Sequence, residues 1–212
     1  MLDKAIIFDL DGTLWDAMLP IMMSYNECMK INKLPYVFDA KKTSSFMGLT
    51  PLETIKLAFP DVDIKEGERL FKLMFDYEIK YLAKHPGKLY PNEEKVISEL
   101  SKSYDLYVVS NADKGYIENY LDGCKMRQYF KGSLCAGDTG LDKHDNIRLL
   151  MKKENIDEVI YVGDTLKDYI ECQKAGVHFI HASYGFGMTE EQVDRINSLN
   201  ELIPLINKIF TK

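Results

Sequence analysis

The sequence predicts an α/β protein, in which a doubly wound parallel sheet carries a small all-helical domain. Short apolar runs alternate with helical patterns at the start of the chain and throughout its second half, as in parallel strands joined by crossover helices. Residues 16–86 instead carry amphipathic helical patterns and no convincing strand. A chain of 212 residues is long enough for one core domain with a small insertion.

The first expected strand is residues 5–8, which are all apolar and end at two aspartates. Four consecutive apolar residues are typical of a strand buried on both faces. Asp9 and Asp11 follow with only Leu10 between them, and Gly12 then allows a sharp backbone turn. Two carboxylates ~4 Å apart repel each other by about 1 kcal/mol even in water, and by more in a cleft. The pair therefore indicates a site that receives a positive group.

The insertion after this strand consists of amphipathic helices. Thr50 is suited to the N-cap of the middle one, and Pro51 to its first helical position. The segment 85–91, which is rich in Pro and Gly, is expected to return the chain to the core. The helical patterns occupy 17–31, 48–59 and 66–85.

The second half of the chain supplies the rest of the sheet. Its expected strands are 105–111, 132–136, 158–164 and 178–182, and its expected helices are 92–102, 113–121, 144–154, 166–175 and a terminal one at 199–210. We therefore expect a core made of residues 1–15 and 87–212, with residues 16–86 inserted as a helical cap.

Charge and cysteine content exclude several classes of function. The net charge of −6 provides no basic surface for nucleic acid or for anionic membranes. No apolar run approaches the ~20 residues that span a bilayer. The apolar run at the start of the chain is also too short for the hydrophobic region of a secretion signal. The four cysteines show no close pair and no metal-ligand spacing, so we expect free thiols in a soluble cytoplasmic protein.

Polar side chains gather where the expected strands end, which is where open parallel sheets bind ligands. Ser110 and Asn111 end the second strand, Lys143 starts a helix, and Asp164 and Asp168 follow the fourth strand at a helical spacing. Together with the first two aspartates, these carboxylates favour a divalent cation with oxygen ligands, and Mg²⁺ suits them best. The hydroxyl, the ammonium and the nearby backbone N–H groups are suited to a phosphate group.

The motifs DLDGT (9–13), VVSN (108–111), a lysine before a helix and VGDTLKD (162–168) occur in this order. Over essentially the whole chain they resemble the haloacid dehalogenase-like superfamily, and the helical insertion resembles the cap of its phosphoglycolate phosphatase-like subclass. The resemblance implies a Rossmann-like core and a magnesium-dependent phosphatase that acts on a small phosphorylated metabolite.

The resemblance also implies roles for individual residues. Asp9 would be the nucleophile that becomes an aspartyl-phosphate, and Asp11 would be the general acid and then the general base. Asp164, with Asp9 and the backbone carbonyl of Asp11, would ligate Mg²⁺, and Asp168 would support the ion. The phosphate would be held by Leu10, Gly12, Thr13, Ser110, Asn111 and Lys143.

Three other activities remain open at this point. A phosphomutase of the β-phosphoglucomutase kind keeps both aspartates, but Thr13 stands where such mutases tend to carry an apolar residue, which favours hydrolysis. A dehalogenase has no use for an acid at position 11. A non-catalytic binding protein would not need every catalytic position filled. Substrate choice is expected to depend on the cap loop 45–51, with Lys41 and Lys42 as further candidates.

Overall fold

The computed structural model describes residues 4–187 and 190–211, and it confirms the predicted doubly wound α/β fold. The parts of the expected core at 1–3, 188–189 and 212 lie outside the described residues. The six strands of the sheet are β1 Lys4–Phe8, β4 Asp105–Ser110, β5 Gly132–Cys135, β6 Glu158–Gly163, β7 His178–Ala182 and β8 Asp194–Ile196. All pair in parallel, in the order β5-β4-β1-β6-β7-β8.

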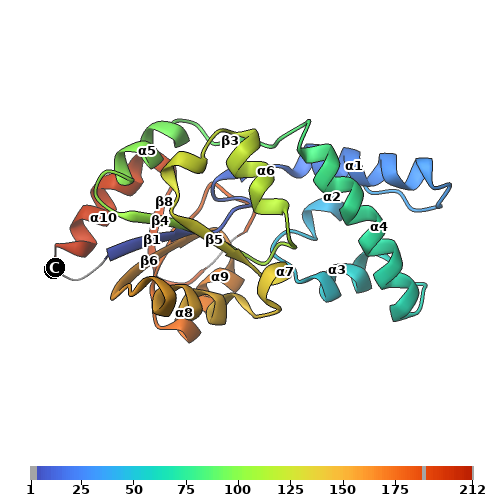
Figure 1. Cartoon of the computed structure of the whole chain (residues 1–212). Helices are drawn as coiled ribbons and strands as arrows, with labels where there is room; N and C mark the ends of the chain where they lie inside the picture. The colour runs from blue at the N-terminus through green and yellow to red at the C-terminus, as the bar shows by residue number, and fades with distance from the viewer. Residues whose placement is uncertain (1–3, 188–189, 212) are drawn as a thin grey trace.

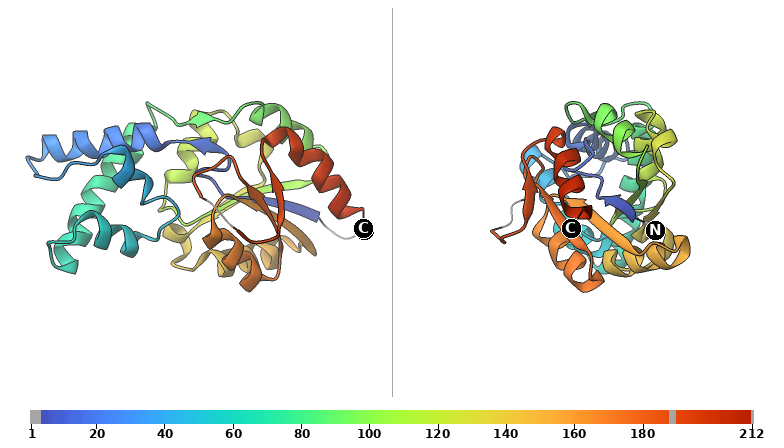
Figure 2. Two further views of the ribbon diagram at one scale, coloured as in Figure 1. Left: turned by 180° about the vertical axis from the view of Figure 1, so that it is seen from behind. Right: turned by 90° about the vertical axis from the view of Figure 1, so that its left-hand side faces the viewer.

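Helices cover both faces of this sheet, as Figure 1 shows. One face carries α5 (Glu93–Leu100), α6 (Tyr116–Gly123) and α10 (Leu202–Phe210), and the other carries α8 (Lys143–Glu154) and α9 (Leu166–Ala175). The short elements α7 (Ala136–Thr139), η1 (Arg127–Tyr129) and η2 (Leu199–Glu201) complete the core. The view along the molecule in Figure 2 shows the helices surrounding the strands.

Alternating side chains of each strand pack into two separate hydrophobic clusters, one on each face. In β1, Ile6 and Phe8 belong to the larger cluster, whereas Ala5 and Ile7 belong to the smaller one. A strand whose residues are all apolar can bury both faces in this way, because successive side chains point to opposite sides. This double burial explains the continuous apolar run that begins the sequence motif.

The inserted helices lie beyond the carboxyl ends of the strands (Figure 1). They are α1 (Met18–Ile31), α2 (Ala40–Ser44), α3 (Pro51–Ala58) and α4 (Ile64–Leu82). Thr50 caps α3 as predicted: its hydroxyl accepts from the Glu53 N–H, and the Glu53 carboxylate accepts from the Thr50 N–H. The loop before α3 thus lies in the part of the insertion that faces the carboxyl ends of the strands.

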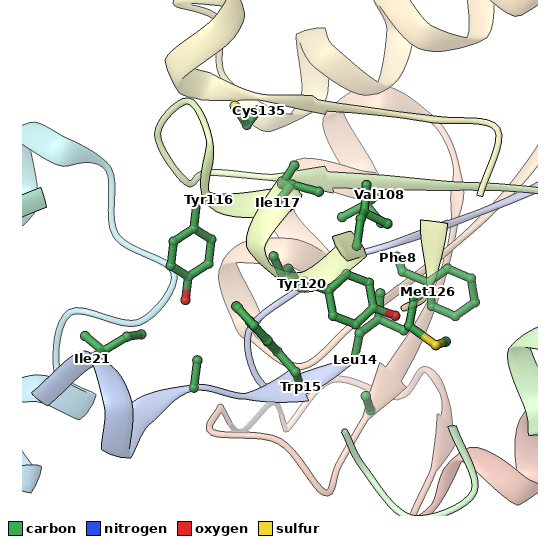
Figure 3. Packing of buried hydrophobic residues seen from close by; sticks show 14 of the residues in the cluster. Phe8, Leu14, Trp15, Ile21, Val108, Tyr116, Ile117, Tyr120, Met126 and Cys135 are labelled. Carbon is green, nitrogen blue, oxygen red and sulfur yellow. The ribbon is translucent and has the colours of Figure 1, made fainter. Parts of the chain in front are cut away.

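A two-stranded ribbon joins the inserted helices to the core, and the sequence analysis missed it. Trp15–Asp16 (β2) pairs antiparallel with Lys88–Leu89 (β3). Two residues are too few to show a period-2 pattern, so the second strand was read as part of an irregular linker. Trp15 is fully buried, and Figure 3 shows it among Tyr116, Tyr120 and Leu14.

The state of the cysteines and the length of the apolar helices were also expected from the sequence. Cys28, Cys124, Cys135 and Cys172 are all free, as expected. Within 4–187 and 190–211, no helix is long and apolar enough to cross a membrane.

Candidate active site

The site lies at the carboxyl ends of three adjacent strands. The central strand β1 runs between β4 and β6, so the residues that follow these strands meet at one edge of the sheet. Asp9 follows β1 directly, Ser110 ends β4, and Asp164 follows β6. The order of the strands thus brings together residues more than 150 positions apart in the sequence.

Lys143 is a buried cation, although it is the first residue of a helix. Its side chain is 2 % exposed, and its Nζ lies 2.9 Å from Asp9 Oδ1 and 2.5 Å from Asp168 Oδ1. Burial opposes the charged form, but the two carboxylates outweigh burial and raise the pKa of the ammonium above its usual range. Lys143 is therefore charged at neutral pH and holds Asp9 in place.

Asp9, Asp164 and Asp168 form an acidic cluster in which one oxygen from each side chain lies within 4.8 Å of the others. All three side chains are buried. Burial raises the pKa of Asp9, while the Lys143 ammonium opposes this shift. When all three carboxylates are ionised, one ammonium leaves the cluster with a net negative charge, which suits a divalent cation.

Asp164 provides the clearest sign of a metal ligand. Its Oδ2 accepts hydrogen bonds from the backbone N–H groups of Phe186 (2.6 Å) and Gly187 (3.1 Å), whereas its Oδ1 is buried and has no hydrogen-bond partner. An unpaired buried carboxylate oxygen is costly unless a ligand completes it. Burial and the charge of Asp168 raise the pKa of Asp164 to about 7.

Gly12 is required by the position of Asp164. It has a φ of +76°, and a Cβ at this position would lie 2.2 Å from Asp164 Oδ2. Both facts favour glycine, because other residues adopt this backbone conformation at a cost and no side chain fits here. The backbone N–H of Gly12 donates to the Trp15 carbonyl.

Asp168 uses both of its oxygens within the protein. One accepts from Lys143, and the other accepts from the Thr165 N–H and hydroxyl in a capping box at the start of α9. These contacts fix Lys143 and shape the acidic cluster.

Asp11 faces a different environment from the other aspartates. Its Oδ1 accepts hydrogen bonds from the Tyr116 hydroxyl (2.7 Å) and the Trp15 indole N–H (3.0 Å). Figure 3 shows the Tyr116 ring reaching from α6 toward the chain near Trp15. Burial raises the pKa of Asp11 to about 6, although both hydrogen bonds lower it. Asp11 is thus suited to exchange a proton near neutral pH.

A cavity of about 80 Å³ separates these residues from the inserted helices. The predicted loop faces it, through Phe46, Met47, Gly48 and Leu49. The core contributes Asp9, Asp11, Ser110, Asn111 and Lys143. The two further candidates for substrate choice, Lys41 and Lys42, do not line this cavity, and Lys42 Nζ donates to the Ala58 carbonyl.

Only some of the residues predicted to bind phosphate face the cavity. The Ser110 hydroxyl accepts from the Ala112 N–H, and the Asn111 amide donates to the Gly48 carbonyl of the cap loop. Leu10 and Thr13 are fully buried, and the Leu10 carbonyl accepts from the Thr13 N–H in a tight turn. Ser110, Asn111 and Lys143 therefore face the cavity, whereas Leu10, Gly12 and Thr13 shape the loop beneath it.

Comparison with known proteins agrees with this geometry. The family described as haloacid dehalogenase-like hydrolases matches residues 6–182. The chain belongs to this hydrolase family. A phosphoglycolate phosphatase of Pseudomonas fluorescens (strain Pf-5) is 25% identical, over 96% of this chain and 79% of that protein. This haloacid dehalogenase-like hydrolase is accordingly an enzyme of the phosphatase type, similar to the phosphoglycolate phosphatases.

Solved structures support the family fold of this hydrolase. A haloacid dehalogenase-like family hydrolase from Streptococcus pneumoniae superimposes with a TM-score of 0.82 at 23% identity, covering 96% of this chain and 98% of that chain. A predicted phosphatase from Clostridium acetobutylicum gives a TM-score of 0.78 at 27% identity, covering 98% and 99%. The likeness thus extends over the inserted helices as well as the core.

The sequence analysis of this haloacid dehalogenase-like hydrolase missed several residues around the site. Trp15 was not among the expected site residues, yet its indole N–H donates to Asp11. Tyr116 and the cap residue Glu78 carry no motif of their own, and only the fold brings them to the cavity. The loop at 184–187 was not among the expected site segments either, but the N–H groups of Phe186 and Gly187 donate to Asp164. Its repeated glycines, next to the last strand, were the only signal available.

Proposed function

We propose that this enzyme is a magnesium-dependent phosphatase that hydrolyses a small phosphate monoester through an aspartyl-phosphate on Asp9. The observation that carries the proposal is the placement of Asp9. This buried carboxylate belongs to the acidic cluster, is paired with the charged Lys143, and lines the same cavity as Asp11. The relatives' name makes 2-phosphoglycolate one candidate within the class of small phosphate esters.

The first half of the proposed reaction transfers the phosphoryl group to the protein. An oxygen of Asp9 attacks phosphorus and forms a P–O bond, while the bond from phosphorus to the ester oxygen breaks. Protonated Asp11 gives its proton to the departing alkoxide, and the alcohol leaves. Lys143 and Ser110 orient the phosphoryl oxygens, and Lys143 reduces the repulsion between the two anions.

The second half releases phosphate. Asp11, now a carboxylate, takes a proton from a water molecule that attacks the phosphorus of the aspartyl-phosphate. The bond from phosphorus to the Asp9 oxygen breaks, so that the free carboxylate and inorganic phosphate are regenerated. The hydrogen bonds from Tyr116 and Trp15 keep Asp11 aimed at the cavity during both steps.

The residues present fit a magnesium ion. Asp9 and Asp164 would provide carboxylate ligands, and the Asp11 carbonyl would provide a backbone oxygen. Asp168 would support the site by its hydrogen bond to Lys143. The unpartnered oxygen of Asp164 is the feature that favours this assignment. When bound, the ion would neutralise negative charge on the phosphoryl oxygens.

We further propose that residues 16–86 act as a cap that covers the site, on a core of 1–15 and 87–212. Two contacts between the insertion and the core support this covering role. The amide of Asn111 donates to the Gly48 carbonyl, and Lys167 pairs with Glu53 at 2.7 Å. Both join the core to the loop or helix that borders the cavity.

The proposal is tested by phosphate release from a panel of small phosphate esters, with and without Mg²⁺. We expect release that depends on the metal and that is abolished in a folded Asp9→Asn variant, because an amide of the same volume is a poor nucleophile. Circular dichroism and thermal unfolding verify the fold of the variant. Phosphate release by folded Asp9→Asn at the wild-type rate would falsify the assignment.

A further inference from the structure

We infer that Glu78 selects the alcohol part of the substrate, and that the enzyme takes phosphate esters of small alcohols that carry a cationic nitrogen and no second anion. The inference rests on the proposed phosphatase function and narrows it to a substrate class. It follows from how the two ends of the cavity differ in charge and in side-chain type.

The cavity has a polar core end and a largely apolar cap end. The core end presents Asp9, Ser110 and Lys143, which would receive the phosphoryl group. The cap end is walled by aromatic rings from three segments of the insertion: Tyr25, Phe46, Phe71 and Phe75. The alcohol part of a bound ester would lie against these rings, because the phosphoryl group is fixed beside Asp9.

Glu78 is the acidic side chain that the cap contributes to this cavity. It comes from α4, its residue is 2 % exposed, and the Tyr25 hydroxyl hydrogen-bonds to it. The pKa of Glu78 is raised to about 8, chiefly by burial and in part by the nearby charges of Asp11 and Asp113. A buried carboxyl group that no cation offsets is costly in its charged form, so a cation from the substrate would stabilise it.

The cavity offers no partner for a second anion. Among the described residues that line it, Lys143 is the only lysine or arginine, and Asp9 and Asp168 already hold its ammonium at the core end. A carboxylate or second phosphate on the alcohol would therefore face Glu78 without a compensating charge. Such a group would lose its hydration in this pocket without gaining a cationic partner, which is costly.

A cationic nitrogen fits the same end of the cavity on two counts. The faces of Tyr and Phe rings attract cations, and a desolvated site strengthens this attraction. A carboxylate beside the rings adds an opposite charge and a hydrogen-bond acceptor. A hydroxyl would satisfy only the hydrogen bond, so a neutral alcohol should rank between the cationic and the anionic one.

Three esters with the same two-carbon skeleton test this order directly: phosphoethanolamine, 2-hydroxyethyl phosphate and 2-phosphoglycolate. For the wild-type enzyme with Mg²⁺, we expect kcat/KM to decrease in that order, by at least about 100-fold from the first to the last. A higher kcat/KM for 2-phosphoglycolate than for phosphoethanolamine would overturn the inference.

Glu78→Gln keeps the shape of the side chain and removes its charge. We expect kcat/KM for phosphoethanolamine to fall about tenfold or more relative to kcat/KM for 2-hydroxyethyl phosphate, because only the cationic substrate uses the charge. Glu68→Gln, exposed on the same helix, is the matched control. An unchanged ratio of kcat/KM between the two substrates in folded Glu78→Gln would also overturn the inference.

The inference and the proposed function fail in different ways. If the folded enzyme releases phosphate from a generic ester but prefers the anionic alcohol, the inference alone is wrong. If it releases no phosphate from any ester in the presence of Mg²⁺, the proposed function is wrong and the inference falls with it.

Discussion

Asp11 and Asp9 are two residues apart, yet their surroundings suit them to different tasks. Burial raises the pKa of both carboxyl groups; the Lys143 ammonium opposes the shift at Asp9, and hydrogen bonds from Tyr116 and Trp15 oppose it at Asp11. Burial raises the pKa of Asp11 to about 6, so a useful fraction of it carries a proton near neutral pH. The proposed nucleophile is thus paired with an ammonium group, and the proposed acid with two neutral hydrogen-bond donors.

The acid role of Asp11 predicts a dependence on the leaving group. Asp11→Asn should slow hydrolysis of alkyl phosphates by about 10²–10⁴-fold, because the alkoxide then leaves without a proton. Nitrophenyl phosphate has a good leaving group, so its transfer step should lose much less. Single-turnover kinetics measure the rate of the phosphoryl-transfer step for each of the two substrates. An equal loss for both substrates would remove Asp11 from the acid role.

The double role of Asp9 predicts inhibition by Ca²⁺. Mg²⁺ takes one carboxylate oxygen in a strict octahedron and leaves the other free to attack, whereas Ca²⁺ accepts more ligands and tolerates bidentate carboxylates. A small misplacement of the attacking oxygen can cost about 10²-fold in rate. Titrating Ca²⁺ at two fixed Mg²⁺ concentrations should show inhibition that more Mg²⁺ relieves. Turnover with Ca²⁺ equal to that with Mg²⁺ would contradict the shared role.

At the residue scale, the sequence revealed the residues that belong to motifs and missed those that act from elsewhere. Asp9, Asp164 and Lys143 could be found because each follows or begins a recognisable element. Tyr116 and Glu78 could not, because a tyrosine or a glutamate on an amphipathic helix has no local feature that separates a site residue from a packing residue. Only the tertiary structure brings their helices to the cavity.

Helix α5 begins with a glutamate buried on the inner side of its first turn. Glu93 is 1 % exposed, and its two oxygens accept from the Tyr120 hydroxyl (2.7 Å) and the Tyr90 N–H (3.1 Å). Burial outweighs both hydrogen bonds and raises the pKa of Glu93 from 4.5 to about 8. The folded state therefore binds a proton more tightly than the unfolded state, and it must release that proton as the pH rises.

This shift predicts that the wild-type protein loses stability as the pH rises from about 5 to 9. The unfolded state releases the proton near pH 4.5 and the folded state near pH 8, so the loss develops between these values. Relative to Glu93→Gln, which cannot titrate, the free energy of unfolding of the wild type should fall by about 2–4 kcal/mol over this range. Urea unfolding at several pH values measures it, with the exposed Glu94→Gln as the control. A difference that stays constant with pH, or increases, would contradict the assignment.

At the scale of elements, regular patterns were predictable and short ones were not. Strands β1, β4, β6 and β7 are buried runs of five or six residues, and all were found to within one residue at each end. Strand β8 has three residues, and β2 and β3 have two each. Such strands are too short to show periodicity, and they form because a neighbouring strand is already in place.

At the scale of the whole molecule, the inserted helices α1–α4 lie beyond the carboxyl ends of the strands (Figure 1). The cavity is lined by residues of these helices and by residues that follow the strands. The chain passes between the inserted helices and the core at the β2–β3 ribbon, where Trp15 pairs with Leu89 and also bonds to Asp11. We expect the cap to open for substrate entry and to close over the bound ester, which would exclude water from the phosphoryl group.

Trp15 provides a signal for this motion because it is the only tryptophan in the chain. Its emission should change when a phosphate mimic binds in the presence of Mg²⁺, since its indole N–H contacts Asp11 at the base of the cap. Small-angle scattering should show a decrease in the radius of gyration under the same conditions. If neither the emission nor the radius changes on binding, a moving cap is contradicted.

The central claim is that Asp9 carries the phosphoryl group during turnover. The most direct measurement is acid quenching of the enzyme during hydrolysis of a ³²P-labelled phosphate ester, followed by peptide mapping and mass spectrometry. We predict one labelled peptide, which contains Asp9, loses its label in hydroxylamine and is absent from the Asp9→Asn variant. Phosphate release without any covalent label, or a label on a residue other than Asp9, would contradict the account.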